Sequence, residues 1–157
     1  MNNKRMTLAA AVTVLGLGLA SPAFSMSSDS TDPVAQSDDY RAAIALIAAE
    51  KYDAAIPLLQ KSLAEKGDYA DALNQLGFAN RKMGDWQAGM AYYLKALALE
   101  PNHLGANEYL GELYLEQKDL PNAEKQLAAL KSACGDCDEF DELEEAVADY
   151  KKNNNIN

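Results

Sequence analysis

Apolar residues between positions 70 and 101 recur every three or four residues, which is the spacing of one buried face on an α-helix. The pattern breaks at Gly84 and Asp85 and ends at Pro101. We therefore expect two amphipathic helices joined by a tight turn. Their inward positions are Leu73, Leu76 and Gly77 in the first helix and Trp86, Gly89, Tyr93, Ala96 and Leu97 in the second.

The same pattern returns with a period of 34 residues in both directions along the chain. Leu76 and Gly77 become Leu110 and Gly111 one period later, and Tyr93 has Leu59 one period earlier. A repeat of this length built from helix pairs is typical of a stacked-helix solenoid. At Gly77 and Gly111 we expect each helix to approach its paired helix closely, because glycine has no side chain to hold them apart.

These spaced residues resemble the tetratricopeptide repeat family between Ser37 and Lys131. The middle repeat matches best, and the first matches least because Ala42 and Ala43 stand where Leu-Gly is expected. The resemblance implies an all-α fold, an α-solenoid of three helix-turn-helix pairs. The matching residues are Leu73, Leu76, Gly77, Tyr93, Ala96 and Pro101 in the middle repeat and Leu110, Gly111, Tyr114, Ala123 and Leu127 in the third.

A further amphipathic stretch follows the third repeat. Phe140, Leu143, Val147 and Tyr150 fall on one face of a helix whose other face is acidic. An array of repeats needs a terminal element that covers its last apolar face and presents a polar face to water. We therefore predict a C-terminal capping helix, so that the repeat domain spans residues 37–152 and residues 153–157 form a disordered tail.

The N-terminus has the pattern of a secretory signal peptide. Two basic residues precede an almost wholly apolar run from Met6 to Ala20, and residues 23–25, Ala-Phe-Ser, match a small-x-small cleavage site. The apolar run is shorter than the roughly 20 residues that a membrane-spanning helix needs. We expect residues 1–25 to be the signal peptide, residues 26–36 to be a flexible leader, and the product to be exported without a membrane span, to a bacterial periplasm.

The chain carries 24 acidic and 14 basic residues, a formal net charge of −10 at pH 7. Loss of residues 1–25 removes two basic and no acidic residues, which takes the net charge from −10 to −12. Such a chain repels nucleic acid and anionic membrane surfaces, and no cluster of Lys or Arg offsets this repulsion. We therefore expect a protein or peptide partner and no nucleic acid, with self-association of the chain as a further option.

Cys134 and Cys137 are the only cysteines in the chain. In an exported protein such a pair indicates a disulfide, here a clip that precedes the capping helix. The alternative is a redox-active or chaperone-like assembly factor that uses the two thiols, because the same spacing occurs in thioredoxin-like enzymes. We favour the disulfide, because no strand is expected before the pair and the nearby Asp136, Asp138 and Glu139 disfavour a thiolate.

No catalytic constellation is visible in the sequence. His103 is the only histidine, and its place at a repeat junction is typical of a surface residue at a helix start. Two cysteines alone cannot close a tetrahedral zinc site. We therefore expect no enzymatic activity, no metal site and no cofactor.

The resemblance to the tetratricopeptide repeat family implies a scaffold or adaptor for protein–protein interaction in the periplasm, since that family binds peptides on its concave surface. An apolar first repeat and an acidic third repeat suit an apolar segment flanked by Lys or Arg. The positions that match the family's peptide-binding groove are Tyr40, Ile44, Ile47, Asn74, Phe78, Arg81, Glu108, Tyr109 and Glu112.

Overall fold

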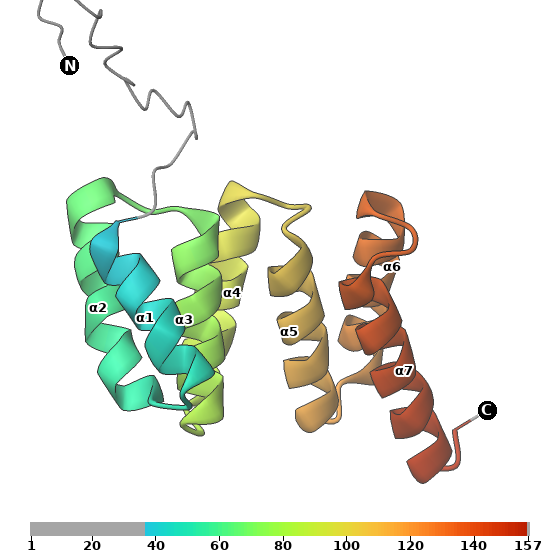
Figure 1. Cartoon of the computed structure of the whole chain (residues 1–157). Helices are drawn as coiled ribbons and strands as arrows, with labels where there is room; N and C mark the ends of the chain where they lie inside the picture. The colour runs from blue at the N-terminus through green and yellow to red at the C-terminus, as the bar shows by residue number, and fades with distance from the viewer. Residues whose placement is uncertain (1–36, 157) are drawn as a thin grey trace, which may run out of the picture. The chain divides into compact units, whose positions relative to one another are not determined.

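The computed structural model describes residues 37–156, so the predicted signal peptide and leader lie outside the described residues. Contacts divide the chain into Met1–Pro33 and Val34–Asn157, and all described residues belong to the second unit. Within residues 37–156 there are seven helices and no strand (Figure 1). The helices are α1 (Asp38–Ala48), α2 (Tyr52–Lys66), α3 (Ala70–Lys82), α4 (Trp86–Leu99), α5 (Leu104–Glu116), α6 (Leu120–Ala133) and α7 (Asp138–Asn153).

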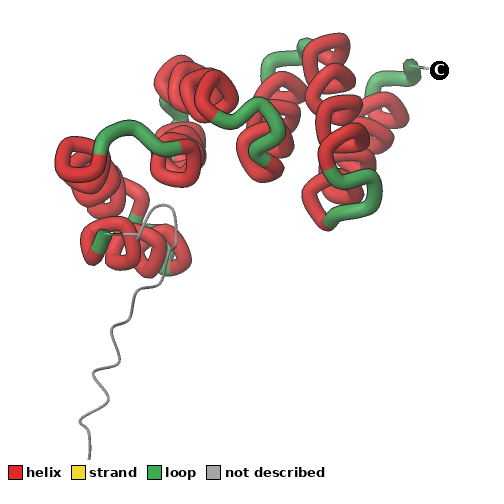
Figure 2. Tube along the Cα trace, turned by 90° about the horizontal axis from the view of Figure 1, so that it is seen from above, coloured by secondary structure: helices red, strands yellow, loops and turns green. Residues whose placement is uncertain are grey.

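The helices pack as three successive pairs followed by a single helix (Figure 2). α1 packs with α2, α3 with α4 and α5 with α6, while α2 also contacts α3 and α4 contacts α5. The first helices of the pairs contact one another in order, and we call the surface formed by α1, α3 and α5 the inner face. α7 packs on α5 and α6. The predicted all-α solenoid with a capping helix is therefore confirmed.

Side chains just before the helices satisfy the free backbone N–H groups of the first turns. The Ser37 hydroxyl accepts a hydrogen bond from the Tyr40 N–H at 3.1 Å and so starts α1. The Asp85 carboxylate accepts one from the Ala88 N–H at 3.0 Å and so starts α4 directly after the turn. His103 caps α5 through its Nδ1 atom, which confirms that it is a helix-start residue. These caps fix where α1, α4 and α5 begin.

Gly77 is the point of closest approach within the middle pair. The ring of Tyr93 from α4 fills the space above it, and a methyl group on Gly77 would lie 2.5 to 3.0 Å from ring atoms of Tyr93. Tyr93 itself is fully buried. The predicted close contact between α3 and α4 is therefore confirmed.

Gly111 makes a different contact from the one predicted. Its nearest neighbour is Leu143 of α7, whose methyl carbons would lie 2.5 and 2.8 Å from an added methyl group, rather than a residue of the paired helix α6. The residue of α6 equivalent to Tyr93 is Leu127, which is shorter and leaves room for Leu143. Gly111 of the third repeat thus allows close packing of the capping helix α7 on α5.

α7 buries the apolar face that the sequence predicted. Phe140, Leu143 and Val147 are buried against α5 and α6, and the helix ends one residue beyond the predicted limit. The sulfur atoms of Cys134 and Cys137 lie 2.05 Å apart, the length of a disulfide bond. Across residues 37–156, no helix combines the length and apolar character needed to cross a bilayer.

Replacing Gly77 with Ala should destabilise the fold, because the added methyl group would overlap the Tyr93 ring. Overpacking costs roughly 1–3 kcal/mol, against about 1 kcal/mol that alanine gains over glycine in helix propensity. The free energy of unfolding, measured by urea denaturation, should fall for Gly77→Ala and fall further for Gly77→Leu.

The double variant Gly77→Ala, Tyr93→Leu serves as the control, since a smaller side chain at position 93 leaves room for the methyl group. It should be more stable than the sum of the two single changes predicts. A Gly77→Leu variant that unfolds at the wild-type urea concentration would contradict the packing of α3 on α4.

Candidate functional site

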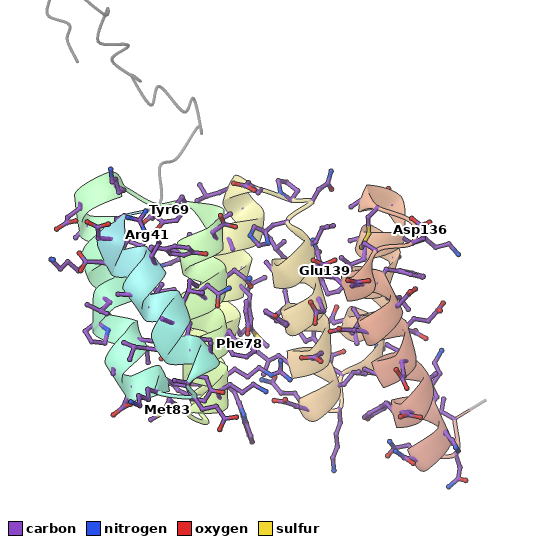
Figure 3. All side chains as sticks on the ribbon, in the orientation of Figure 1. Arg41, Tyr69, Phe78, Met83, Asp136 and Glu139 are labelled. Atoms are coloured by element: carbon purple, nitrogen blue, oxygen red, sulfur yellow. A yellow bond between two sulfur atoms is a disulfide. The ribbon has the colours of Figure 1, made fainter. Side chains whose placement is uncertain are left out.

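Phe78 of α3, labelled in Figure 3, is in contact with aromatic side chains from two other helices. The centre of the Phe78 ring lies 5.0 Å from that of Tyr109 in α5 and 6.0 Å from that of Tyr52 at the start of α2. The Lys82 ammonium lies 5.1 Å from the centre of the Phe78 ring. These distances are those of aromatic pairs and of a cation–π contact. We call Tyr52, Phe78 and Tyr109 the aromatic cluster, and all three residues remain partly exposed.

The aromatic cluster brings together two residues of the predicted groove, Phe78 and Tyr109. The sequence missed Tyr52, because it stands on the second helix of the first pair, outside the positions that match the family's groove. The signal that marks it is its place at the start of α2, directly after the turn from α1. The cluster therefore extends from the second helix of the first pair to the first helix of the third.

Arg81 of α3 is buried under two carboxylates of α5. Its guanidinium donates to Glu112 at 2.5 Å and to Glu116 at 2.5 and 2.9 Å, and only 9% of the residue is exposed. Burial lowers the pKa of Arg81, but hydrogen bonds and charges from Glu116 and Glu112 outweigh it and raise the pKa. The predicted groove residues Arg81 and Glu112 are thus brought together as an ion pair between helices, so Arg81 is not free to bind a ligand.

Glu108 of α5 is 4% exposed and faces the carboxylates of Glu139 and Glu142 on α7. Burial, a hydrogen bond with Glu142 and the charges of Glu112, Glu142 and Glu139 raise the pKa of Glu108 to about 8. Glu108 therefore holds a proton at neutral pH, and its ionised form would need a positive charge beside it. We call Glu108, Glu139 and Glu142 the acidic cluster.

The acidic cluster contains one predicted residue and two that the sequence missed. Glu139 and Glu142 belong to α7, which the sequence identified only as a cap for the apolar end of the array. The sequence pattern that could have found them is the helical spacing, because Glu139 and Glu142 lie three residues apart and so share a side of α7. α7 therefore covers the end of the solenoid and also supplies part of the candidate site.

The first-repeat residues of the predicted groove lie deeper than expected. Tyr40 is 6% exposed and packs against Tyr69, with ring centres 5.8 Å apart, so it belongs to the core and not to an open groove. Ile44 and Ile47 are half-buried against the same core. Asn74 is buried, and its Oδ1 atom has no hydrogen-bond partner among the described residues. The accessible part of the inner face is therefore centred on α3 and α5.

A shallow pocket of about 260 Å³ opens between α6 and α7, away from the predicted groove positions. Its apolar floor is formed by Leu127, Ala128 and Phe140. Charged side chains at the rim are Glu124, Lys131 and Glu144. None of these residues belongs to the aromatic or the acidic cluster, so the pocket is a separate surface feature.

The comparisons with known proteins agree with this architecture. The family model of the tetratricopeptide repeat matches residues 70–103, which form α3, α4 and the loop that ends at the N-cap of α5. No curated protein matches the chain. This match coincides with one helix pair inside a solenoid of three such pairs.

Solved structures with the same fold include three tetratricopeptide proteins. The type III secretion chaperone SycD of Yersinia enterocolitica, solved with a peptide of the translocator YopD, is 19% identical with a TM-score of 0.64, covering 75% of this chain and 90% of SycD. MamA is 20% identical with a TM-score of 0.66, covering 80% of this chain and 71% of MamA. YrrB, described as having an unusual peptide-binding site, is 18% identical with a TM-score of 0.55, covering 80% of this chain and 73% of YrrB.

The stability of the protein should fall as pH rises from about 5 to 8, because the folded state retains a proton on Glu108 that the unfolded chain releases near its usual pKa. The stabilising effect of that proton is complete below the unfolded pKa and is lost as pH passes the folded value. Glu108→Gln should remove this part of the pH dependence, measured by urea unfolding at a series of pH values.

The matched control is Glu144→Gln, which removes an exposed carboxylate from α7 and should leave the pH profile unchanged. Equal profiles for wild type and Glu108→Gln would mean that Glu108 ionises normally in the folded protein.

Proposed function

We propose that the chain is a protein-binding scaffold whose inner face binds a peptide segment of a partner protein. The observation that carries this proposal is the aromatic cluster, which leaves partly exposed rings on a surface that repeat packing does not require to be aromatic. Large apolar side chains at such a place are typical of a binding surface. SycD, solved with a bound peptide, and YrrB, described as peptide-binding, support the proposal because they share the fold.

Phe78 is the anchor of the proposed site. Its ring is held between Tyr52 and Tyr109 and lies under the Lys82 ammonium, so little side-chain freedom remains to be lost on binding. Aromatic side chains held in this way account for much of the binding energy at protein interfaces. We expect an apolar side chain of the partner to pack on this ring.

The acidic cluster sets the charge of the proposed ligand. Among residues 37–156, no Lys, Arg or His forms an ion pair with its three carboxyl groups, in contrast to Glu112 and Glu116, which share Arg81. A Lys or Arg of the partner would stabilise the ionised form of Glu108, whereas an acidic segment would be repelled. The favoured ligand is therefore an apolar segment flanked by basic residues.

A synthetic peptide of defined sequence tests whether the inner face binds an apolar segment flanked by basic residues. Calorimetry with a synthetic peptide that has a Leu-Phe-Leu centre and two lysines on each side should detect binding, and Phe78→Ala should weaken it several-fold. Truncation of such an anchor costs about 1 kcal/mol or more. The matched control is Tyr92→Ala, because Tyr92 of α4 is also half-buried with a lysine, Lys95, 5.5 Å from its ring centre.

A second experiment tests whether the acidic cluster attracts the basic residues of the peptide. Glu142→Lys should slow association with the same peptide, and the effect should shrink in high salt. Glu142 is chosen over Glu112, because a change at Glu112 would leave Arg81 partly unpaired and disturb the fold. Unchanged affinity of both Phe78→Ala and Glu142→Lys would place any peptide binding elsewhere on the molecule.

We also propose that binding takes place in a bacterial periplasm. The support is the signal-peptide pattern of residues 1–25 together with the cysteine pair, since disulfides persist in oxidising compartments. The intact mass of the chain recovered from the periplasmic fraction should correspond to a chain that begins at Met26 and is two hydrogens lighter than its reduced form. An unprocessed mass in the cytoplasmic fraction would contradict export, and a reduced mass would contradict the disulfide.

A further inference from the structure

The outer surface of α4 differs from that of every other described helix. Within residues 37–156, α4 is the one helix that contains no Asp or Glu, and Lys95 is its single charged residue. Three of its large apolar side chains are about half exposed: Trp86 at 51%, Leu94 at 48% and Leu99 at 50%. A strongly acidic chain thus presents one helix without carboxylates, on which three large apolar side chains are exposed.

This surface faces away from the rest of the solenoid. Gly89, Tyr93 and Ala96 are the buried residues of α4, and α4 packs only on α3 and α5. The opposite side of the helix is exposed and is not covered by any other described helix. Along that side the residues are Gln87, Ala91, Leu94 and Ala98, which we call the α4 stripe.

The fold itself does not demand an apolar surface at these positions. The repeat period of 34 residues places Gln60 and Glu65 of α2 at the positions of Leu94 and Leu99. Both of these α2 residues are exposed and polar, as is usual for the outer surface of a solenoid. The apolar residues of α4 therefore need a reason other than the packing of the repeats.

The α4 stripe is complementary to itself. Its members are separated by four, three and four residues, so the spacing reads the same in both directions along the helix. In an antiparallel pair of α4 helices, a two-fold axis between positions 92 and 93 sets each Leu94 opposite Ala91 and each Gln87 opposite Ala98. The same axis brings Trp86 at the start of one helix level with Leu99 at the end of the other, on opposite sides of the contact. Within the stripe, the larger Leu94 and Gln87 then meet alanines, as close helix packing requires.

We propose that the α4 stripe is the contact surface between two copies of this chain, packed antiparallel about that two-fold axis. Such a contact is isologous, because each copy uses the same patch, and it closes at two copies.

Charge favours a second copy as the occupant of this surface. With a net charge of −10, two chains repel each other over most of their surfaces, and α4 lets them meet without setting carboxylates face to face along the helix. Asp85 and Glu100 flank α4 at its two ends and approach each other in the pair, so added salt should strengthen association. A basic partner would be drawn to the acidic cluster instead, since α4 offers it no carboxylate.

The size of the surface predicts weak association. A helix of 14 residues is roughly 21 Å long, and one face of it buries less than the standard 800 Å² or so per partner of a stable complex. We therefore expect monomers at micromolar concentration and dimers as the concentration approaches the millimolar range.

The test uses sedimentation equilibrium of the purified protein. The apparent mass should approach that of a dimer as concentration rises. Leu94→Glu should keep the protein monomeric. Gln60→Glu, which adds the same charge at the equivalent exposed position of α2, should behave as the wild type does.

Three outcomes would overturn the proposal. The wild type could remain monomeric up to millimolar concentration in high salt, the Leu94→Glu variant could still dimerise, or Gln60→Glu could weaken association as much as Leu94→Glu does. Peptide affinity of the Leu94→Glu variant is measured in parallel and should be unchanged, because the α4 stripe lies on the side of α4 opposite to its contacts with α3 and α5. Failure of dimerisation is thereby separated from failure of peptide binding.

Discussion

The close approach of α3 and α4 at Gly77 determines where the rings of the inner face lie. Because Gly77 has no side chain, the Tyr93 ring occupies the space above the α3 backbone. The Tyr93 ring centre lies 6.2 Å from that of Tyr109, and Tyr109 in turn lies 5.0 Å from Phe78. The contact between Gly77 and Tyr93 in the middle repeat thus positions Tyr109 of the third repeat. Tyr109 in turn supports the exposed ring of Phe78 in the middle repeat. The candidate site depends on packing that begins in the core.

Arg81 fixes the second pair against the third in a different way. A buried ion pair adds little to stability on average, because removing the charges from water costs about as much as their attraction returns. Loss of one partner is costly, however, since it leaves an unpaired charge in the interior. The bonds from Arg81 to Glu112 and Glu116 therefore select one relative position of α3 and α5. That position sets the spacing between Phe78 and Tyr109.

The fold could be predicted from the sequence because its signal is local and repeated. The apolar spacing defines each helix, and the period of 34 residues defines how the pairs follow one another. The site could be predicted only in part, because burial at each position depends on what the next helix supplies. Arg81 has an inner-face position in its own repeat, yet carboxylates one repeat later enclose it. The sequence also missed Tyr52, Glu116, Glu139 and Glu142, because all four lie outside the positions that match the groove.

The carboxylates on the outer side of α7 limit how copies of the chain can join end to end. An exposed apolar end would let one solenoid continue into the next, and such head-to-tail joining does not close but grows into a filament. α7 ends the array with exposed Asp141, Glu144, Glu145 and Asp149, so the terminal surface of every copy is negatively charged. Such a surface offers no apolar face on which the first helix pair of another copy could stack, so head-to-tail joining is disfavoured.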